Sequence, residues 1–177
     1  MHKLISLALL MAMPVFGQDQ ATDLRTAAGC GPIETQFSVK TDKMQHATKE
    51  PGPGRAQVYV IEQGKPEGGE AMVTTRVGLD GNWVGANRGE SYLSFAVEPG
   101  EHHLCVDWQS NLKSRQRLSG AANLTAEAGK TYYFRTEVVL AQATESHDER
   151  LNIKTIDAAD GMLMMSKSAQ SSWKVKK

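Results

Sequence analysis

Histidines and carboxylates in one stretch of the chain are the first residues whose types suggest chemistry. His102 and His103 are adjacent, Glu101 precedes them and Asp107 follows. Neighbouring side chains of an extended strand point to opposite faces, so the two histidines cannot bind one metal ion from a regular strand. His103 would share its face with Glu101, Cys105 and Asp107, which together form a row of carboxylate, imidazole and thiol groups.

Such a row holds zinc only if another strand supplies a further ligand, and His46 and His147 are available for that role. His103 and Asp107 are therefore the candidate metal ligands. A metal-dependent or hydrolytic exported enzyme that uses the His102/His103 region is one hypothesis. The alternative interpretation makes His102 a hydrogen-bonded structural residue and leaves His103 half exposed.

Two short motifs lack residues that a catalytic or cofactor-binding site needs. Gly129-Lys130-Thr131 resembles the end of a phosphate-binding loop, but Leu124 stands where the first glycine belongs, and an aromatic strand follows instead of a helix. Gly89-Glu90-Ser91 begins like a nucleophile elbow, but Leu93 replaces the closing glycine. The sequence therefore predicts a protein that is not an enzyme and that uses no cofactor.

Aromatic and basic residues supply a candidate ligand surface. Trp83 lies just past a predicted turn, where an exposed flat ring can stack on a sugar. Lys113, Arg115 and Arg117 alternate, so an extended backbone would align three cations on one face, where they can bind a phosphate or an acidic glycan. A charged row of this kind also keeps a sheet edge from pairing with another strand, and that alternative stays open.

Cys30 and Cys105 are the two cysteines of the chain. In an oxidising compartment they are predicted to form a disulfide, which would tie the strand that follows Cys30 to the main sheet. The alternatives are two unpaired thiols, or a lipid attached to Cys30 after the small residues 27–29.

The first 17 residues resemble a secretory signal peptide. Lys3 supplies the positive start, residues 4–13 form a short apolar core, and Pro14 ends that core before Gly17. The apolar core is too short to span a bilayer, and no later segment has the length of a membrane-spanning helix. The protein is therefore expected in the periplasm or the extracellular medium after cleavage, with no integral membrane segment.

The elements that must position these residues are predicted to be strands. Apolar and polar residues alternate from Ile33 to Lys40 and again in many segments between residues 55 and 165, where Asp80-Gly81 marks a tight hairpin turn. One helix is predicted from Asp157 to Lys167. This pattern is typical of an all-β protein, an antiparallel β-sandwich of about seven to nine strands with one short C-terminal helix.

The same patterns divide the chain into four parts. Residues 1–17 form the signal peptide, and residues 18–54 form a flexible lead, one strand and a Pro/Gly linker. Residues 55–165 form the β-sandwich domain. Residues 166–177 carry four lysines and no acid, so they are predicted to be a basic flexible tail in solvent.

Two motifs in the sandwich region resemble a known type of protein. Val77-Gly78-Leu79-Asp80-Gly81-Asn82-Trp83-Val84-Gly85 and Val97-Glu98-Pro99-Gly100-Glu101-His102-His103-Leu104 occur in that order, with Ala128-Gly129-Lys130-Thr131-Tyr132-Tyr133-Phe134 downstream. This combination resembles uncharacterised bacterial exported domains that share a D-G-x-W-V-G hairpin and a P-G-E-H strand, and it is distantly similar to the PEGA-type envelope sandwich. The resemblance implies an envelope protein of sandwich type and carries no activity or ligand.

The composition of the chain narrows the classes of function. Lys and Arg number 20, and so do Asp and Glu, so the formal net charge is zero and a nucleic-acid binder with a strong basic field is excluded. The prediction is an exported, non-catalytic binding or structural module of the bacterial cell envelope, with an envelope protein or a glycan as its partner. The sequence leaves the ligand and the oligomeric state undetermined.

Overall fold

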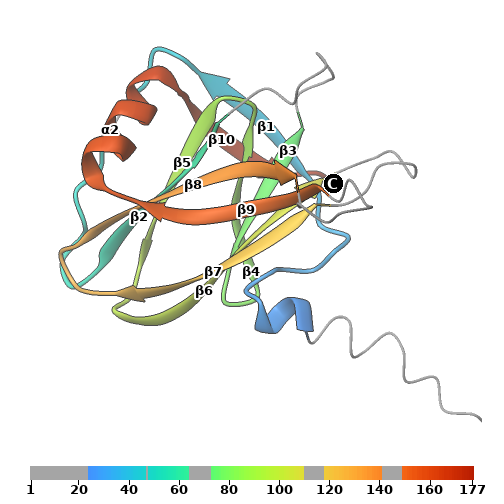
Figure 1. Cartoon of the computed structure of the whole chain (residues 1–177), viewed down its shortest axis with the longest axis horizontal. Helices are drawn as coiled ribbons and strands as arrows, with labels where there is room; N and C mark the ends of the chain where they lie inside the picture. The colour runs from blue at the N-terminus through green and yellow to red at the C-terminus, as the bar shows by residue number, and fades with distance from the viewer. Residues whose placement is uncertain (1–23, 47, 64–72, 110–117, 141–148) are drawn as a thin grey trace, which may run out of the picture.

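Two β-sheets packed face to face make up most of the described chain (Figure 1). The computed structural model describes residues 24–46, 48–63, 73–109, 118–140 and 149–177. Its strands are β1 (Phe37–Asp42), β2 (Ala56–Glu62), β3 (Thr74–Leu79), β4 (Asn82–Arg88), β5 (Ser91–Val97), β6 (Gly100–Gln109), β7 (Ser119–Ala126), β8 (Thr131–Leu140), β9 (Glu149–Ile156) and β10 (Ala169–Val175).

The strands divide into a six-stranded and a four-stranded sheet. Sheet A has the order β1-β10-β5-β2-β8-β9, and sheet B has the order β4-β3-β6-β7. Neighbouring strands run antiparallel except in two pairs, β10 with β5 and β2 with β8. The predicted all-β sandwich is confirmed, and the described part of the chain holds one strand more than the expected seven to nine.

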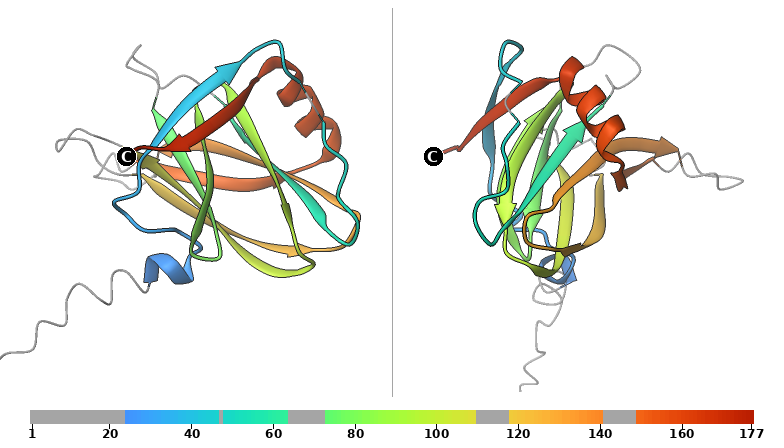
Figure 2. Two further views of the ribbon diagram at one scale, coloured as in Figure 1. Left: turned by 180° about the vertical axis from the view of Figure 1, so that it is seen from behind. Right: turned by 90° about the vertical axis from the view of Figure 1, so that its left-hand side faces the viewer.

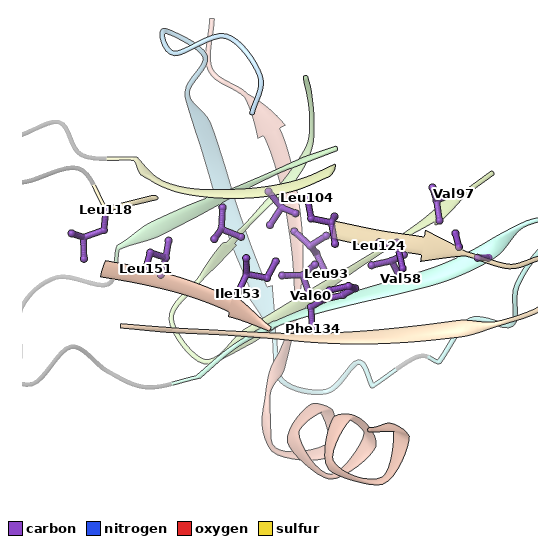
Figure 3. Close-up of a cluster of buried hydrophobic side chains, with 14 residues drawn as sticks. Val58, Val60, Leu93, Val97, Leu104, Leu118, Leu124, Phe134, Leu151 and Ile153 are labelled. Carbon is purple, nitrogen blue, oxygen red and sulfur yellow. The ribbon is translucent and has the colours of Figure 1, made fainter. Parts of the chain in front are cut away.

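The core lies between the two sheets, where the inward side chains of both meet (Figure 3). Val58 and Val60 of sheet A face Val77, Leu104 and Val106 of sheet B in one cluster, and all five are fully buried. Each such side chain contributes roughly 1.5–3 kcal/mol by leaving water. The alternation of apolar and polar residues therefore correctly predicts which side chains of these strands face the core.

Strand β2 is buried on its second face as well. Tyr59 and Ile61 point away from sheet B and pack with Met164 and Met165 of helix α2 (Ala158–Lys167). Figure 1 shows α2 lying against this side of sheet A. Burial on both faces explains why Val58-Tyr59-Val60-Ile61 is a continuous apolar run rather than an alternating one.

Helix α2 confirms the predicted helix, including its cap. The Asp157 carboxylate accepts a hydrogen bond from the Asp160 N–H at 2.8 Å, which satisfies one of the free donors at the first turn. Met164 and Met165 face the sheet, whereas Met162 is 51% exposed. Gly161 lies directly against the ring of Tyr133, so this glycine permits close contact between helix and sheet.

Residues 24–36, the described part of the segment before β1, are ordered, and for these residues the predicted flexible lead is wrong. Residues 24–27 form one helical turn, and the chain then runs along the outer face of sheet B. The carbonyl oxygens of Ile33 and Thr35 both accept hydrogen bonds from Arg76, at 2.9 and 2.7 Å. Because these carbonyls turn toward one side chain, the first strand begins at Phe37 and not at Ile33.

The predicted basic flexible tail is also wrong, because residues 169–175 form β10. Residues 170–175 of this strand pair with all of β1, and Ala169 and Gln170 pair with β5. The Trp173 ring meets the Phe37 ring edge to face, with centroids 5.4 Å apart. Figure 2 shows β1 and β10 side by side along one side of the molecule.

Substitution of Gly161 by alanine should destabilise the protein, although alanine favours helix. The new Cβ would collide with the Tyr133 ring, and overpacking of this kind costs about 1–3 kcal/mol. Urea unfolding should show this loss. Gly52→Ala is the matched control, because no heavy atom lies within 4 Å of its Cβ position. Equal effects of the two substitutions would contradict the packing explanation.

Candidate functional site

The predicted disulfide bonds the N-terminal segment, residues 24–36, to sheet B. Cys30 and Cys105 are bonded, with their Cα atoms 5.0 Å apart, and both are almost completely buried. The close approach depends on Gly29 and Gly78, since a side chain at either position would collide with the other segment's backbone. The disulfide confirms the prediction and excludes the two alternatives of free thiols and a lipidated Cys30.

A buried ion network lies next to the disulfide on the same face of β6. Asp107 has no solvent-exposed surface, and its carboxylate binds the buried guanidinium of Arg76 and, at 2.7 Å, the guanidinium of Arg25. Burial raises the pKa of Asp107, but the hydrogen bonds and charges of the two arginines outweigh it and hold the pKa below its usual value. Asp107 is therefore ionised and joins the N-terminal segment to both β3 and β6.

Trp83 completes this network instead of offering a free platform. The guanidinium of Arg76 lies over its ring, 4.4 Å from the centroid, and the indole N–H donates to the Pro32 carbonyl at 2.8 Å. Gly31 also packs directly against the ring. The prediction of a sugar-stacking surface at Trp83 is wrong, because the chain's own residues occupy the ring.

His102 is held at a corner between the two sequence motifs. Its Nδ1 lies 2.6 Å from a carboxylate oxygen of Asp80, and its Nε2 lies 2.8 Å from the Glu98 carbonyl. Asp80 also accepts the His103 backbone N–H at 2.8 Å. Both ring nitrogens of His102 therefore face acceptors, which agrees with the structural interpretation of this residue.

The charge state of this corner follows from its contacts. Burial lowers the pKa of His102, but the hydrogen bonds to Asp80 and Glu98 and the charge of Asp80 outweigh it, so the pKa is raised. The pKa of Asp80 is lowered, because the hydrogen bonds and charges of His102 and His103 outweigh its desolvation. The pair is thus charged between the two pKa values, and its stabilising effect is lost as the pH rises above the pKa of His102.

The predicted metal row is not assembled. Cys105 is bonded to Cys30, and Asp107 is bound by arginines, so neither group faces His103 as a free ligand. His46 lies elsewhere, with Nδ1 3.2 Å from the Met165 carbonyl. Within the described ranges, no group of three His, Cys, Asp or Glu residues could hold a metal ion. His147 falls outside those ranges.

The other predicted ligand residues are not part of this site. Lys113, Arg115 and Arg117 lie outside the described residues, so the structure does not bear on the predicted basic row.

Sequence reasoning missed two kinds of residue. Arg25 and Arg76 were not singled out, although Arg76 pairs across the strands with Asp107 and so shares its face. Glu62 was missed at the end of β2, where it continues the inward row of Val58 and Val60. For Arg76 and Glu62 alike, the available signal was a charged residue at a strand position that faces the same side as buried residues.

Glu62 forms a polar tie between the sheets. Thr75 of sheet B donates its hydroxyl hydrogen to Glu62 Oε1 at 2.7 Å, while Oε2 is buried and has no hydrogen-bond partner among the described residues. Desolvation by burial raises the pKa of Glu62 to about 8, against the smaller opposing effect of the Thr75 hydrogen bond. A neutral carboxyl at pH 7 avoids the cost of a buried charge.

Replacement of Arg76 by alanine should be severely destabilising. The Asp107 carboxylate would stay buried after losing a guanidinium that it binds directly, and breaking a buried pair in this way costs about 3–5 kcal/mol. Urea unfolding with the disulfide intact measures the loss. The exposed pair Arg55–Glu98 supplies the control, and Arg55→Ala should cost about 0–1 kcal/mol. A similar small loss for Arg76→Ala would show that the buried network is not stabilising.

Glu62→Gln should raise stability at alkaline pH. The folded protein binds this proton up to about pH 8 whereas the unfolded chain releases it near 4.5, so stability must fall as the pH rises between these values. The glutamine variant should lose that part of the pH dependence and gain a few kcal/mol at pH 9, since one pKa unit corresponds to about 1.4 kcal/mol. Melting curves from pH 5 to 9 test this. Glu127→Gln, at an exposed position, should leave the slope unchanged.

Among the helices of the described residues, none has the length and apolar character needed to cross a membrane. The chain matches no family model, no curated protein and no solved structure.

Proposed function

We propose that the protein is an exported, non-catalytic binding or structural module of the bacterial cell envelope. The observation that carries the proposal is the buried Cys30–Cys105 disulfide, which fixes the N-terminal segment on sheet B. Structural disulfides form and persist in oxidising compartments such as the periplasm and the extracellular medium. The signal-peptide pattern of residues 1–17 supports the same location.

The structural contacts of the cysteine, aspartate and histidine side chains support a non-catalytic role. Cys105 is bonded to Cys30, Asp107 binds two arginines, and both ring nitrogens of His102 face acceptors. A general base or a metal ligand needs a free lone pair near its substrate or metal. Each of these residues would have to give up a structural contact before it could act on a substrate.

The two motifs that resemble those of exported domains also have structural roles in this chain. Asp80 of the D-G hairpin and His102 of the P-G-E-H strand bind each other, and Trp83 of the hairpin holds the Pro32 carbonyl. The motifs thus build one corner of the sandwich and its contact with the N-terminal segment. The motif residues thus serve the scaffold of the domain, and we expect ligand contacts on other surfaces.

Expression of the full chain in a bacterium tests the proposal. We expect the protein in the periplasmic fraction with a new terminus at or near Gln18. Under denaturing conditions it should show no free thiol, and its mass should rise by two hydrogens on reduction. The control variant carries Leu9→Arg and Leu10→Arg in the apolar core of the leader and should stay in the cytoplasm with Met1 retained.

Metal analysis of the same purified protein separates the two functional hypotheses. The binding module should contain no stoichiometric metal, whereas a metal-dependent enzyme should contain zinc. Wild-type protein that remains in the cytoplasm with two free thiols would contradict export.

A further inference from the structure

The strands β1 and β10 form a two-stranded ribbon with two unlike faces (Figure 2). On the inward face, Phe37 and Val39 are buried and pack with Ala86 of β4, and Trp173 contacts Gly85. The residues between these inward ones on each strand point away from β4, toward solvent. We call this outward side the basic face, and its members are Gln36, Ser38, Lys40, Ser172, Lys174 and Lys176.

Three lysines concentrate positive charge on the basic face. Ser38 pairs with Lys174 and Lys40 pairs with Ser172, so Lys40 and Lys174 are diagonal neighbours with Cα atoms about 7–8 Å apart. Lys176 lies two positions beyond Lys174, about 7 Å further along the strand. All three lysines are exposed.

These charges are not neutralised by ion pairs with the described residues. Elsewhere on the surface, by contrast, Glu137 lies 2.7 Å from Lys154 and also binds Arg135. The carboxylate of Asp42 lies on the same outward side of β1, two positions beyond Lys40, and accepts the Met44 N–H at 2.8 Å. It offsets one of the three lysine charges at most. The basic face is thus a local excess of positive charge on a chain of zero formal net charge.

Protection of a sheet edge does not account for the whole arrangement. Lys40 alone, on edge strand β1, would discourage pairing with another chain. Lys174 belongs to β10, and Lys176 follows the end of β10 and donates its backbone N–H to the Gln36 carbonyl, so both add their charges to the same face. Three separated ammonium groups suit an extended partner with repeated negative charges.

We propose that the basic face of the β1–β10 ribbon binds an anionic glycan polymer of the envelope. This inference rests on the proposed function and names the chemical class of its partner. The lysines attract the carboxylate or phosphate groups, and the side chains of Ser38, Ser172 and Gln36 can hydrogen-bond sugar hydroxyls between them.

The same face is poorly suited to a lipid bilayer. Peripheral proteins add apolar side chains to their lysines, and these enter the acyl region. On this ribbon, Trp173 and Val175 belong to the opposite face together with Phe37. The polar character of the basic face therefore favours a glycan over a membrane.

Binding of the purified, disulfide-bonded protein to polygalacturonate tests the proposal, with neutral dextran as the uncharged comparison. We expect binding to polygalacturonate that weakens as salt is added. The variant K40Q/K174Q/K176Q should bind about tenfold more weakly or worse. The control K49Q/K130Q/K167Q removes the same charge from exposed positions on other elements and should stay within about threefold of wild type. Circular dichroism and melting curves of both variants should match wild type.

Three results would overturn the proposal. The first is an equal loss in both variants, which would mean attraction to charge in general. The second is binding to vesicles of phosphatidylglycerol and phosphatidylcholine but not to polygalacturonate, which would identify a membrane partner. The third is the absence of binding to either probe. Because the assay uses purified protein, these results stand apart from the export experiment, so failure of the proposed function is recognised separately.

Discussion

The negatively charged carboxylate of Asp107 is completely buried. Removing an ion from water costs several kcal/mol unless its partners are held in position. Arg76 supplies one partner from β3, and Arg25 supplies the other from the N-terminal segment. Arg76 also binds the carbonyls of Ile33 and Thr35, which sets the path of the chain into β1. The position of β1, and with it the pairing of β10, thus depends on one charge in the other sheet.

The strands, the capped helix and the disulfide could be predicted because each has a local signal in the sequence. Alternation marks which side of a strand faces the core, and Asp157 or Asp80-Gly81 marks where an element starts or turns. Alternation does not tell what covers the polar side of a strand. Asp107 was therefore predicted as a metal ligand and Trp83 as an exposed ligand surface, whereas the N-terminal segment covers both of them.

Strand β10 could not be predicted for a related reason. Its seven residues include two serines, a glutamine and a lysine, and Trp173 and Val175 are the large apolar residues of its inward face. The strand exists because β1 supplies its hydrogen-bond partners and Phe37 supplies its ring contact. Both lie far away in the sequence, so no local window contains the signal. The same holds for Glu62, whose partner Thr75 belongs to the other sheet.

The open sides of the sandwich are closed in two different ways. On one side, Gly120 of β7 lies against the Leu151 carbonyl of β9, so the absence of a side chain lets the two sheets approach. On the other side, the β1–β10 ribbon packs over β4 through Phe37 and Val39. Edge strands with free hydrogen-bonding groups can pair with other chains, and both arrangements limit that risk.

The pairing of β1 with β10 joins the first and the last strand of the described residues. In a chain that crosses a membrane from its N-terminus, residues 37–42 emerge early and cannot pair until residues 169–175 have also crossed. Cys105 emerges well before residues 169–175, so its disulfide with Cys30 can form before β1 pairs with β10. Vectorial transport would therefore impose a sequence on assembly, in which a covalent loop precedes closure of the larger sheet. During that interval β1 would lack the hydrogen bonds of β10, and Phe37 would lack the Trp173 ring, so the nascent protein would be most exposed to misassociation and to proteases.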